Sequence, residues 1–307
     1  MAPSREVEIP MVAAASAAPM TYLSYGMSSV KGRRPALTDA VVALPSFTSL
    51  SPEMRLDYFA VVDGRYGEAA GRHLRERLAL AVAEQIDDEL LCEAPRFVAG
   101  SDDGVVGWWR TTLRAAFRVA DEEAVSRGVV GDGVAAGATA LVALFLEKYV
   151  VLANSGASRA VVSRGGEVVQ LTPEHRANDR PDDETQGAGS SGAAAGSSPS
   201  NPGVVTEPEV VAVERTPRDE FLILASDGLW DAVTPAAACA FVRVNLLRRT
   251  RMTMPWEAQL DAGRGSPTIV ARELAQRAVR KGSQDNVSVV LILFRDFWAT
   301  RANQRFA

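Results

Sequence analysis

Cysteine and histidine are scarce in this sequence of 307 residues, which contains only two of each. Cys92 and Cys239 both lie in apolar stretches, so we interpret them as small buried residues and expect no disulfide framework. The histidines are His73 and His175, and we expect His73 on the surface of a helix. A zinc site of cysteine and histidine is excluded, because the sequence has no cluster of these residues.

Long apolar runs and excess positive charge are also missing. No apolar run approaches the roughly 20 residues that a membrane-spanning helix needs, and residues 1–20 lack the basic start of a secretory signal. The formal charge of −5 does not suit a polyanionic partner. We therefore expect a protein of the cytoplasm or nucleus, with no nucleic acid and no membrane among its partners. We also expect a monomer.

The apolar pattern predicts many strands and a few helices. Strands are expected at residues 22–30, 40–45, 57–62, 138–146, 149–155, 158–164, 167–171, 209–215, 221–226 and 287–294. Helices are expected at residues 68–91, 106–126 and 266–282, and a further one opens at Thr234-Pro235. Because tight turns join most strands, we predict an α+β fold of mainly antiparallel sheets with helices packed outside.

A change in composition separates the ordered part from tails and a loop. Residues 180–203 are rich in Gly, Ser and Ala and carry too little apolar mass to fold, which predicts a flexible loop. Residues 1–20 are expected to form a disordered N-terminal tail, and residues 299–307 a C-terminal tail. One domain, at residues 21–298, is the expected organisation.

Three aspartates stand where an apolar strand meets a loop: Asp63, Asp227 and Asp285. A glycine follows each of the first two, as Gly64 and Gly228, and lets the backbone approach a bound ion. Carboxylate and carbonyl oxygens are the ligands that Mg²⁺ and Mn²⁺ prefer. Asp-Gly is also an ordinary turn sequence, so each pair taken alone has a simpler explanation. Together, the three aspartates predict a divalent metal site.

Several stretches resemble the metal-dependent protein phosphatase 2C family, and most closely its plant members. They are YGMSSVKGRRPALTDA, FAVVDGRYGE, GATALVALF, VLANSGASRAVV, LTPEH, ILASDGLWDAV and GSQDNVSVVL, in family order from Tyr22 to Phe294. The resemblance implies a four-layer α-β-β-α sandwich of two sheets. It also implies hydrolysis of phosphoserine and phosphothreonine by water that two Mg²⁺ or Mn²⁺ ions activate.

The resemblance assigns roles to individual residues. Asp63 corresponds to the aspartate that bridges both metals, and Gly64 to the glycine whose carbonyl binds one of them. Asp227 and Asp285 correspond to the remaining metal carboxylates. Arg34 corresponds to the arginine that binds the substrate phosphate, although its neighbour Arg33 is equally suitable by residue type.

Two further aspartates fall inside the matching motifs. Asp39 follows the position of a metal-linked glutamate in the family. Asp231 is the second aspartate of DGLWD, where a structural role at a helix end is an equal alternative.

The sequence departs from the family pattern at three positions. Thr38 replaces the metal-linked glutamate, Arg65 replaces the histidine thought to protonate the leaving oxygen, and Ala157 replaces an aspartate linked to a third metal. In addition, the interval that contains SR-x-x-GD in the family holds the Gly/Ser-rich loop here. These changes predict a phosphatase with reduced activity.

Two alternatives remain open at this stage. The first is a pseudophosphatase that binds phosphoproteins or kinases as a scaffold, with Arg65 as an internal cation in place of the second metal. It predicts one tightly bound ion instead of two. The other alternative is a poorly folded product, which the intact apolar runs and helix caps oppose.

Overall fold

Every strand pairing in the described chain is antiparallel, and the strands form two five-stranded sheets. The computed structural model describes residues 24–51, 54–64, 68–92, 102–129, 138–172, 205–249 and 266–294. The tails expected at residues 1–20 and 299–307 and the loop expected at 180–203 lie outside these ranges, as do Arg65 and His175.

Each sheet combines strands from distant parts of the sequence. The first has the order β1 (Ser24–Val30), β10 (Val287–Leu293), β9 (Asp219–Ala225), β6 (Arg159–Arg164) and β7 (Glu167–Gln170). The second has the order β2 (Ala40–Ser51), β3 (Met54–Asp63), β4 (Thr139–Phe145), β5 (Tyr149–Ser155) and β8 (Glu209–Glu214). The N-terminal strand β1 therefore pairs with the C-terminal strand β10.

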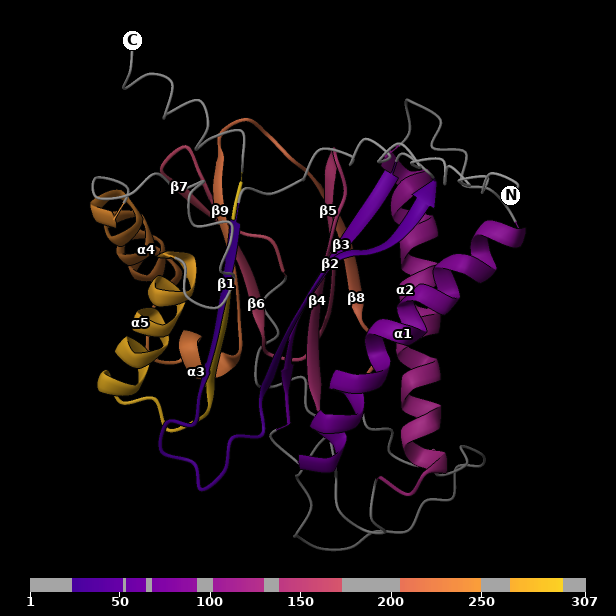
Figure 1. Ribbon diagram of the computed structural model, residues 1–307, viewed down its shortest axis with the longest axis horizontal. Coiled ribbons are helices and arrows are strands. Elements are labelled where there is room, and N and C mark those ends of the chain that lie inside the picture. The colour runs from indigo at the N-terminus through magenta and orange to yellow at the C-terminus, as the bar shows by residue number, and fades with distance from the viewer. Residues whose placement is uncertain are drawn as a thin grey trace, which may run out of the picture.

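Helices cover the outer face of each sheet, as Figure 1 shows. The helices are α1 (Glu68–Cys92), α2 (Asp102–Ser126), α3 (Asp227–Trp230), α4 (Pro235–Arg249) and α5 (Ser266–Arg280). The pair α1 and α2 packs on the second sheet, and α4 and α5 pack on the first. This confirms the predicted α+β fold and the four-layer α-β-β-α sandwich that the family resemblance implies.

Successive residues of a strand face opposite sides of its sheet, and apolar residues recur about every four positions in the helices. These two spacings decide which layer each apolar side chain contacts. In β3, Phe59 and Val61 face the other sheet, whereas the alternate residues Ala60 and Val62 face the helices. Both faces are buried, which is why these antiparallel strands have continuous apolar sequences. In α1, the residues that pack on the sheet are Leu74, Leu78, Val82 and Ile86.

A tight turn and a helix cap agree with the residue types found at those positions. Gly165 and Gly166 link β6 to β7 with φ angles of 56° and 96°, which suits a tight hairpin. The Oγ1 of Thr234 accepts a hydrogen bond from the backbone N–H of Ala237 at 3.3 Å and so caps α4. None of the helices within the described ranges is both long and apolar enough to span a membrane.

Candidate active site

The site lies at one end of the sandwich, where segments from both sheets meet. Strand β3 ends at Asp63, and β2 begins just after Asp39. In the other sheet, Asp227 opens α3 directly after β9, and Asp285 lies two residues before β10 begins. Hydrogen bonds and close backbone contacts, described next, connect these segments.

Asn286 links the two sheets through its side-chain amide. Its Oδ1 accepts hydrogen bonds from the backbone N–H groups of Thr38 and Asp39, at 2.7 and 3.3 Å. Its Nδ2 donates to the carbonyl oxygens of Lys31 and Ala36, at 2.7 and 3.0 Å. Because Asn286 is buried, these bonds fix the loop between β1 and β2 against the start of β10.

The carboxyl groups of Asp39 and Asp63 form a buried, interacting pair. Burial raises the pKa of Asp39 to about 8, and the charge of Asp63 adds to the rise. The side chains of Ser226 and Ser288 lower the pKa of Asp39 and so oppose part of this rise. The Oδ2 of Asp39 is buried and receives no hydrogen bond from the described residues. Two interacting buried carboxyl groups supply oxygen ligands of the kind that a divalent cation prefers.

Asp285 forms a two-pronged ion pair with Arg34. The Nε and Nη2 of Arg34 donate to Oδ1 and Oδ2 of Asp285, at 2.8 and 2.7 Å. The backbone N–H of Asn286 also donates to Oδ1 of Asp285, at 2.8 Å. The predicted phosphate-binding residue therefore contacts a predicted metal ligand directly.

Gly228 brings the turn that carries Asp227 against the segment that carries Asp285. A Cβ atom at position 228 would overlap the carbonyl oxygen of Asn286 and lie 3.4 Å from the Cβ of Asp285. Only a residue without a side chain permits this approach. Asp227 itself is buried.

Gly64 lies between the start of α1 and the loop that precedes β2. A Cβ atom at Gly71 would be 3.0 Å from the Cα of Gly64 and 3.0 Å from the carbonyl oxygen of Thr38. This contact places Gly64 beside Thr38, whose hydroxyl donates to Oδ1 of Asn286 at 3.1 Å. The threonine at the position of the family's glutamate thus takes part in the link between the sheets.

The segments of the predicted metal ligands meet, and two of the three predicted carboxylates have identified side-chain partners: Asp63 interacts with Asp39, and Asp285 interacts with Arg34. Within the described ranges, no group of three or more His, Cys, Asp or Glu side chains is arranged to hold a metal ion. The donors present are oxygen atoms, which suit Mg²⁺ or Mn²⁺ chemically. The metal roles of Asp63, Gly64, Asp227 and Asp285 and the phosphate role of Arg34 stay predictions.

Other sequence expectations have mixed outcomes. His73 is buried, not exposed, and its Nε2 donates to the carbonyl oxygen of Ala120 at 3.0 Å. Asp231 follows α3 and its backbone N–H donates to the carbonyl oxygen of Asp227 at 2.9 Å, as a residue at a helix end does. Sequence reasoning did not identify Asn286, although its position beside Asp285 in the GSQDN motif was a usable signal.

Comparisons with known proteins agree with this architecture. The family model described as "Protein phosphatase 2C" matches residues 23–185 and 190–287. "Probable protein phosphatase 2C 8" of Oryza sativa subsp. japonica is 33% identical over 307 residues, covering 89% of this chain and 75% of the relative. "Protein phosphatase 2C 56" of Arabidopsis thaliana is 33% identical over 306 residues, covering 87% of this chain and 67% of the relative.

A solved structure shares the fold. The catalytic domain of the serine/threonine protein phosphatase PstP, in complex with two manganese ions, superposes with a TM-score of 0.53 at 21% identity, covering 89% of this chain and 98% of that one. The family pattern and both plant relatives extend over most of the chain, and the two sheets with their outer helices have the matching fold. The chain therefore belongs to the protein phosphatase 2C family, whose members include metal-dependent serine/threonine phosphatases.

Proposed function

We propose that the protein is a serine/threonine phosphatase that depends on Mg²⁺ or Mn²⁺, acts on phosphoproteins and has reduced activity. The observation that carries this proposal is the meeting of the segments that bear Asp63, Asp227 and Asp285. Asn286 binds the loop before β2 and contacts Gly228 through its backbone carbonyl, and Asp63 interacts with Asp39 beside that loop. We expect it to act in the cytoplasm or nucleus as a monomer.

The proposed metal ligands are Asp63, the carbonyl oxygen of Gly64, Asp227 and Asp285. Two ions would follow the family, whereas the substitution of Thr38 for a carboxylate favours one tight ion here. A bound divalent ion supplies positive charge that activates water and neutralises phosphoryl oxygens.

Two tasks remain besides metal binding, namely binding of the substrate phosphate and protonation of the leaving oxygen. The planar guanidinium of Arg34 suits a bidentate contact to the substrate phosphate. The leaving oxygen needs a proton, and Arg65 cannot give one up near neutral pH. Loss of general acid catalysis typically lowers a rate by about 10²–10⁴-fold, which is the physical reason for proposing slow turnover.

A scaffold that binds phosphoproteins or kinases without turnover is the second candidate. The pairing of Arg34 with Asp285 favours it, because the carboxylate is neutralised without a metal ion. The hydrogen bond from the Thr38 hydroxyl to Asn286 also favours the scaffold, because the side chain at the position of the family's glutamate makes a structural contact here.

An assay of a phosphopeptide with Mn²⁺ separates the two candidates. We expect slow, Mn²⁺-dependent phosphate release by the natural chain, abolished by Asp227→Ala. The double variant Thr38→Glu, Arg65→His should be faster by about 10²-fold or more, because it restores a carboxylate and a general acid. Turnover by the double variant alone would favour the scaffold, and turnover unaffected by Asp227→Ala would reject the proposed metal site.

A further inference from the structure

We infer that Arg34 competes with the divalent metal ion for the carboxylate of Asp285, so that metal binding releases Arg34 for the substrate phosphate. This inference rests on the proposed function, since it takes Asp285 as a metal ligand. It adds a link between two events that the proposed function leaves independent, namely metal binding and phosphate binding.

The geometry of the ion pair places Arg34 and a metal ion in competition for the carboxylate of Asp285. Both oxygens of Asp285 accept from Arg34, and Oδ1 accepts a second bond from the backbone of Asn286. A carboxylate oxygen has two lone pairs, so Oδ1 has no lone pair left for a metal ion. A divalent cation placed next to the guanidinium would also be repelled by its charge. The metal can use this carboxylate fully only when Arg34 has left it.

The surroundings allow Arg34 to leave without moving its backbone. Asn286 binds the carbonyl oxygens of Lys31 and Ala36, which lie on either side of Arg34 in the chain. The side chain of Arg34 is 45% exposed, whereas that of Asp285 is 15% exposed. Because the guanidinium is already partly exposed in the ion pair, its full exposure on release changes its hydration free energy little. The exchange is therefore a rotation of one side chain on a fixed loop.

The exchange has a thermodynamic consequence. A metal ion that binds Asp285 must first displace Arg34, so the ion pair weakens the apparent metal affinity. The released guanidinium can then donate two hydrogen bonds to a phosphate, so metal binding raises the affinity of the protein for phosphate. Linkage requires the reverse as well: a phosphate that holds Arg34 raises the metal affinity by the same factor.

Calorimetric titration with Mn²⁺ alone, in the absence of phosphate and substrate, tests the competition without an activity readout. Arg34→Ala should bind Mn²⁺ about 2- to 5-fold more tightly than the natural chain, the range expected from a partly exposed ion pair. The Mn²⁺ affinity of Arg34→Lys should lie between those of Arg34→Ala and the natural chain, because an ammonium group keeps the positive charge but cannot form the two-pronged contact of a guanidinium. Thermal melting in EDTA checks that each variant is folded.

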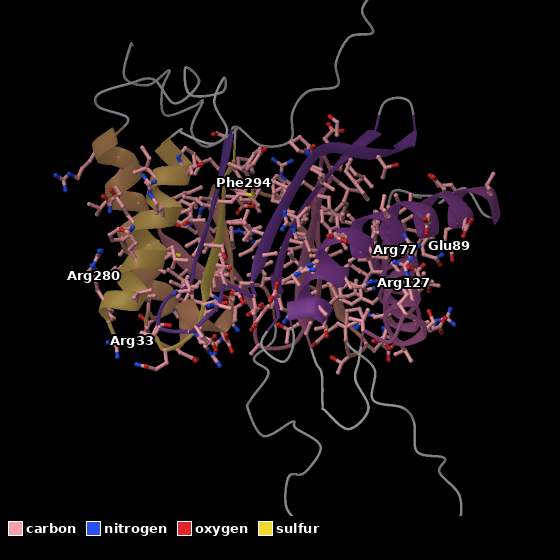
Figure 2. All side chains as sticks on the ribbon, turned by 60° about the horizontal axis from the view of Figure 1, so that its bottom comes forward. Arg33, Arg77, Glu89, Arg127, Arg280 and Phe294 are labelled. Carbon is pink, nitrogen blue, oxygen red and sulfur yellow. The ribbon has the colours of Figure 1, made fainter. Side chains whose placement is uncertain are left out.

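Arg33→Ala is the matched control. Arg33 is the neighbouring residue, is exposed and forms no ion pair with the residues that the structure describes. Figure 2 shows it on the side of the molecule that carries α4 and α5. Its removal changes the formal charge equally but acts only through screened solvent, so the Mn²⁺ affinity should change by less than about 1.5-fold.

Two outcomes would overturn the inference, and they differ in what else they reject. If Asp285→Asn weakens Mn²⁺ binding but Arg34→Ala binds no more tightly than Arg33→Ala, the competition is wrong and the proposed metal site survives. If Asp285→Asn binds Mn²⁺ as tightly as the natural chain, Asp285 is not a ligand, and the assignment in the proposed function fails as well.

Discussion

At the scale of single residues, an uncharged side chain, that of Asn286, connects segments of the site. One buried amide serves two backbone N–H groups and two carbonyl oxygens of the segment between β1 and β2. No other amino acid offers an acceptor and two donors in this shape, except the longer glutamine. The loop that carries Arg34 and Thr38 thus has a fixed position before any ligand arrives.

Asn286→Ala should therefore lower the free energy of unfolding by about 2–4 kcal/mol, because it leaves several buried polar groups without partners. Denaturation with urea measures this change. Gln284→Ala is the control, since Gln284 is exposed and, among the residues that the structure describes, its side chain donates to the nearby carbonyl oxygen of Gly282 alone. Equal stability of the two variants would mean that water replaces the amide at no cost.

How far the sequence predicted the site depends on the range of its interactions. Asp63, Asp227 and Asp285 each stand beside a local signal, the end or start of an apolar run. The partners of Asn286 lie 247 to 255 positions away in the chain, so no local sequence pattern predicts them. The ion pair between Arg34 and Asp285 spans 251 positions and was missed for the same reason.

At the scale of elements, the short helix α3 and its glycine set the spacing between two strand ends. Gly228 lets the turn after β9 touch the backbone before β10. The sequence did not predict α3, because four residues are too few to show a helical period. It also ended β2 at residue 45, whereas the strand continues to Ser51. Ser46, with a φ angle of 52°, bends it, and pairing resumes at Thr48.

Gly228→Ala should displace the turn that carries Asp227, because the new methyl group overlaps the carbonyl oxygen of Asn286. We expect a loss of about 1–3 kcal/mol in the free energy of unfolding. The loss of Mn²⁺ affinity should be larger than this loss of stability explains. Calorimetry and denaturant titration measure the two quantities.

Gly107→Ala in α2 is the control for this substitution. A Cβ atom there meets no atom within 4 Å, and alanine favours a helix over glycine, so this variant should be slightly more stable than the natural chain. A Gly228→Ala variant that matches it in stability and metal affinity would show that the backbone contact has no consequence.

At the scale of the whole molecule, one apolar layer joins the two sheets. Phe59, Phe145 and Phe294 pack together between them, with ring centroids 5.4 and 5.8 Å apart along the series. Phe294 is seen between the two helix layers in Figure 2. Because the proposed metal ligands come from both sheets, a metal ion should stabilise the sandwich as one unit.

Removal of the metal tests this coupling. At an Mn²⁺ concentration of about 100 times the dissociation constant, binding to the folded state adds about 2.7 kcal/mol of stability. EDTA should therefore lower the Tm of a single calorimetric transition. Asp63→Asn should lose most of this difference, because it removes the proposed bridging ligand. Two separate transitions in EDTA would show that the sheets unfold independently.

Strand β10 has one more consequence, which concerns the order in which the chain is made. Its residues pair with β1 and β9 and directly follow Asp285 and Asn286, yet they are among the last described residues of the chain. During synthesis, β1 and the loop that carries Arg34 leave the ribosome before their partners, because Asp285 follows Arg34 by 251 positions. A nascent chain that stops short of residue 285 lacks both the strand that joins β1 to β9 and the amide that anchors the loop. The site can therefore assemble only after residue 286 has been synthesised.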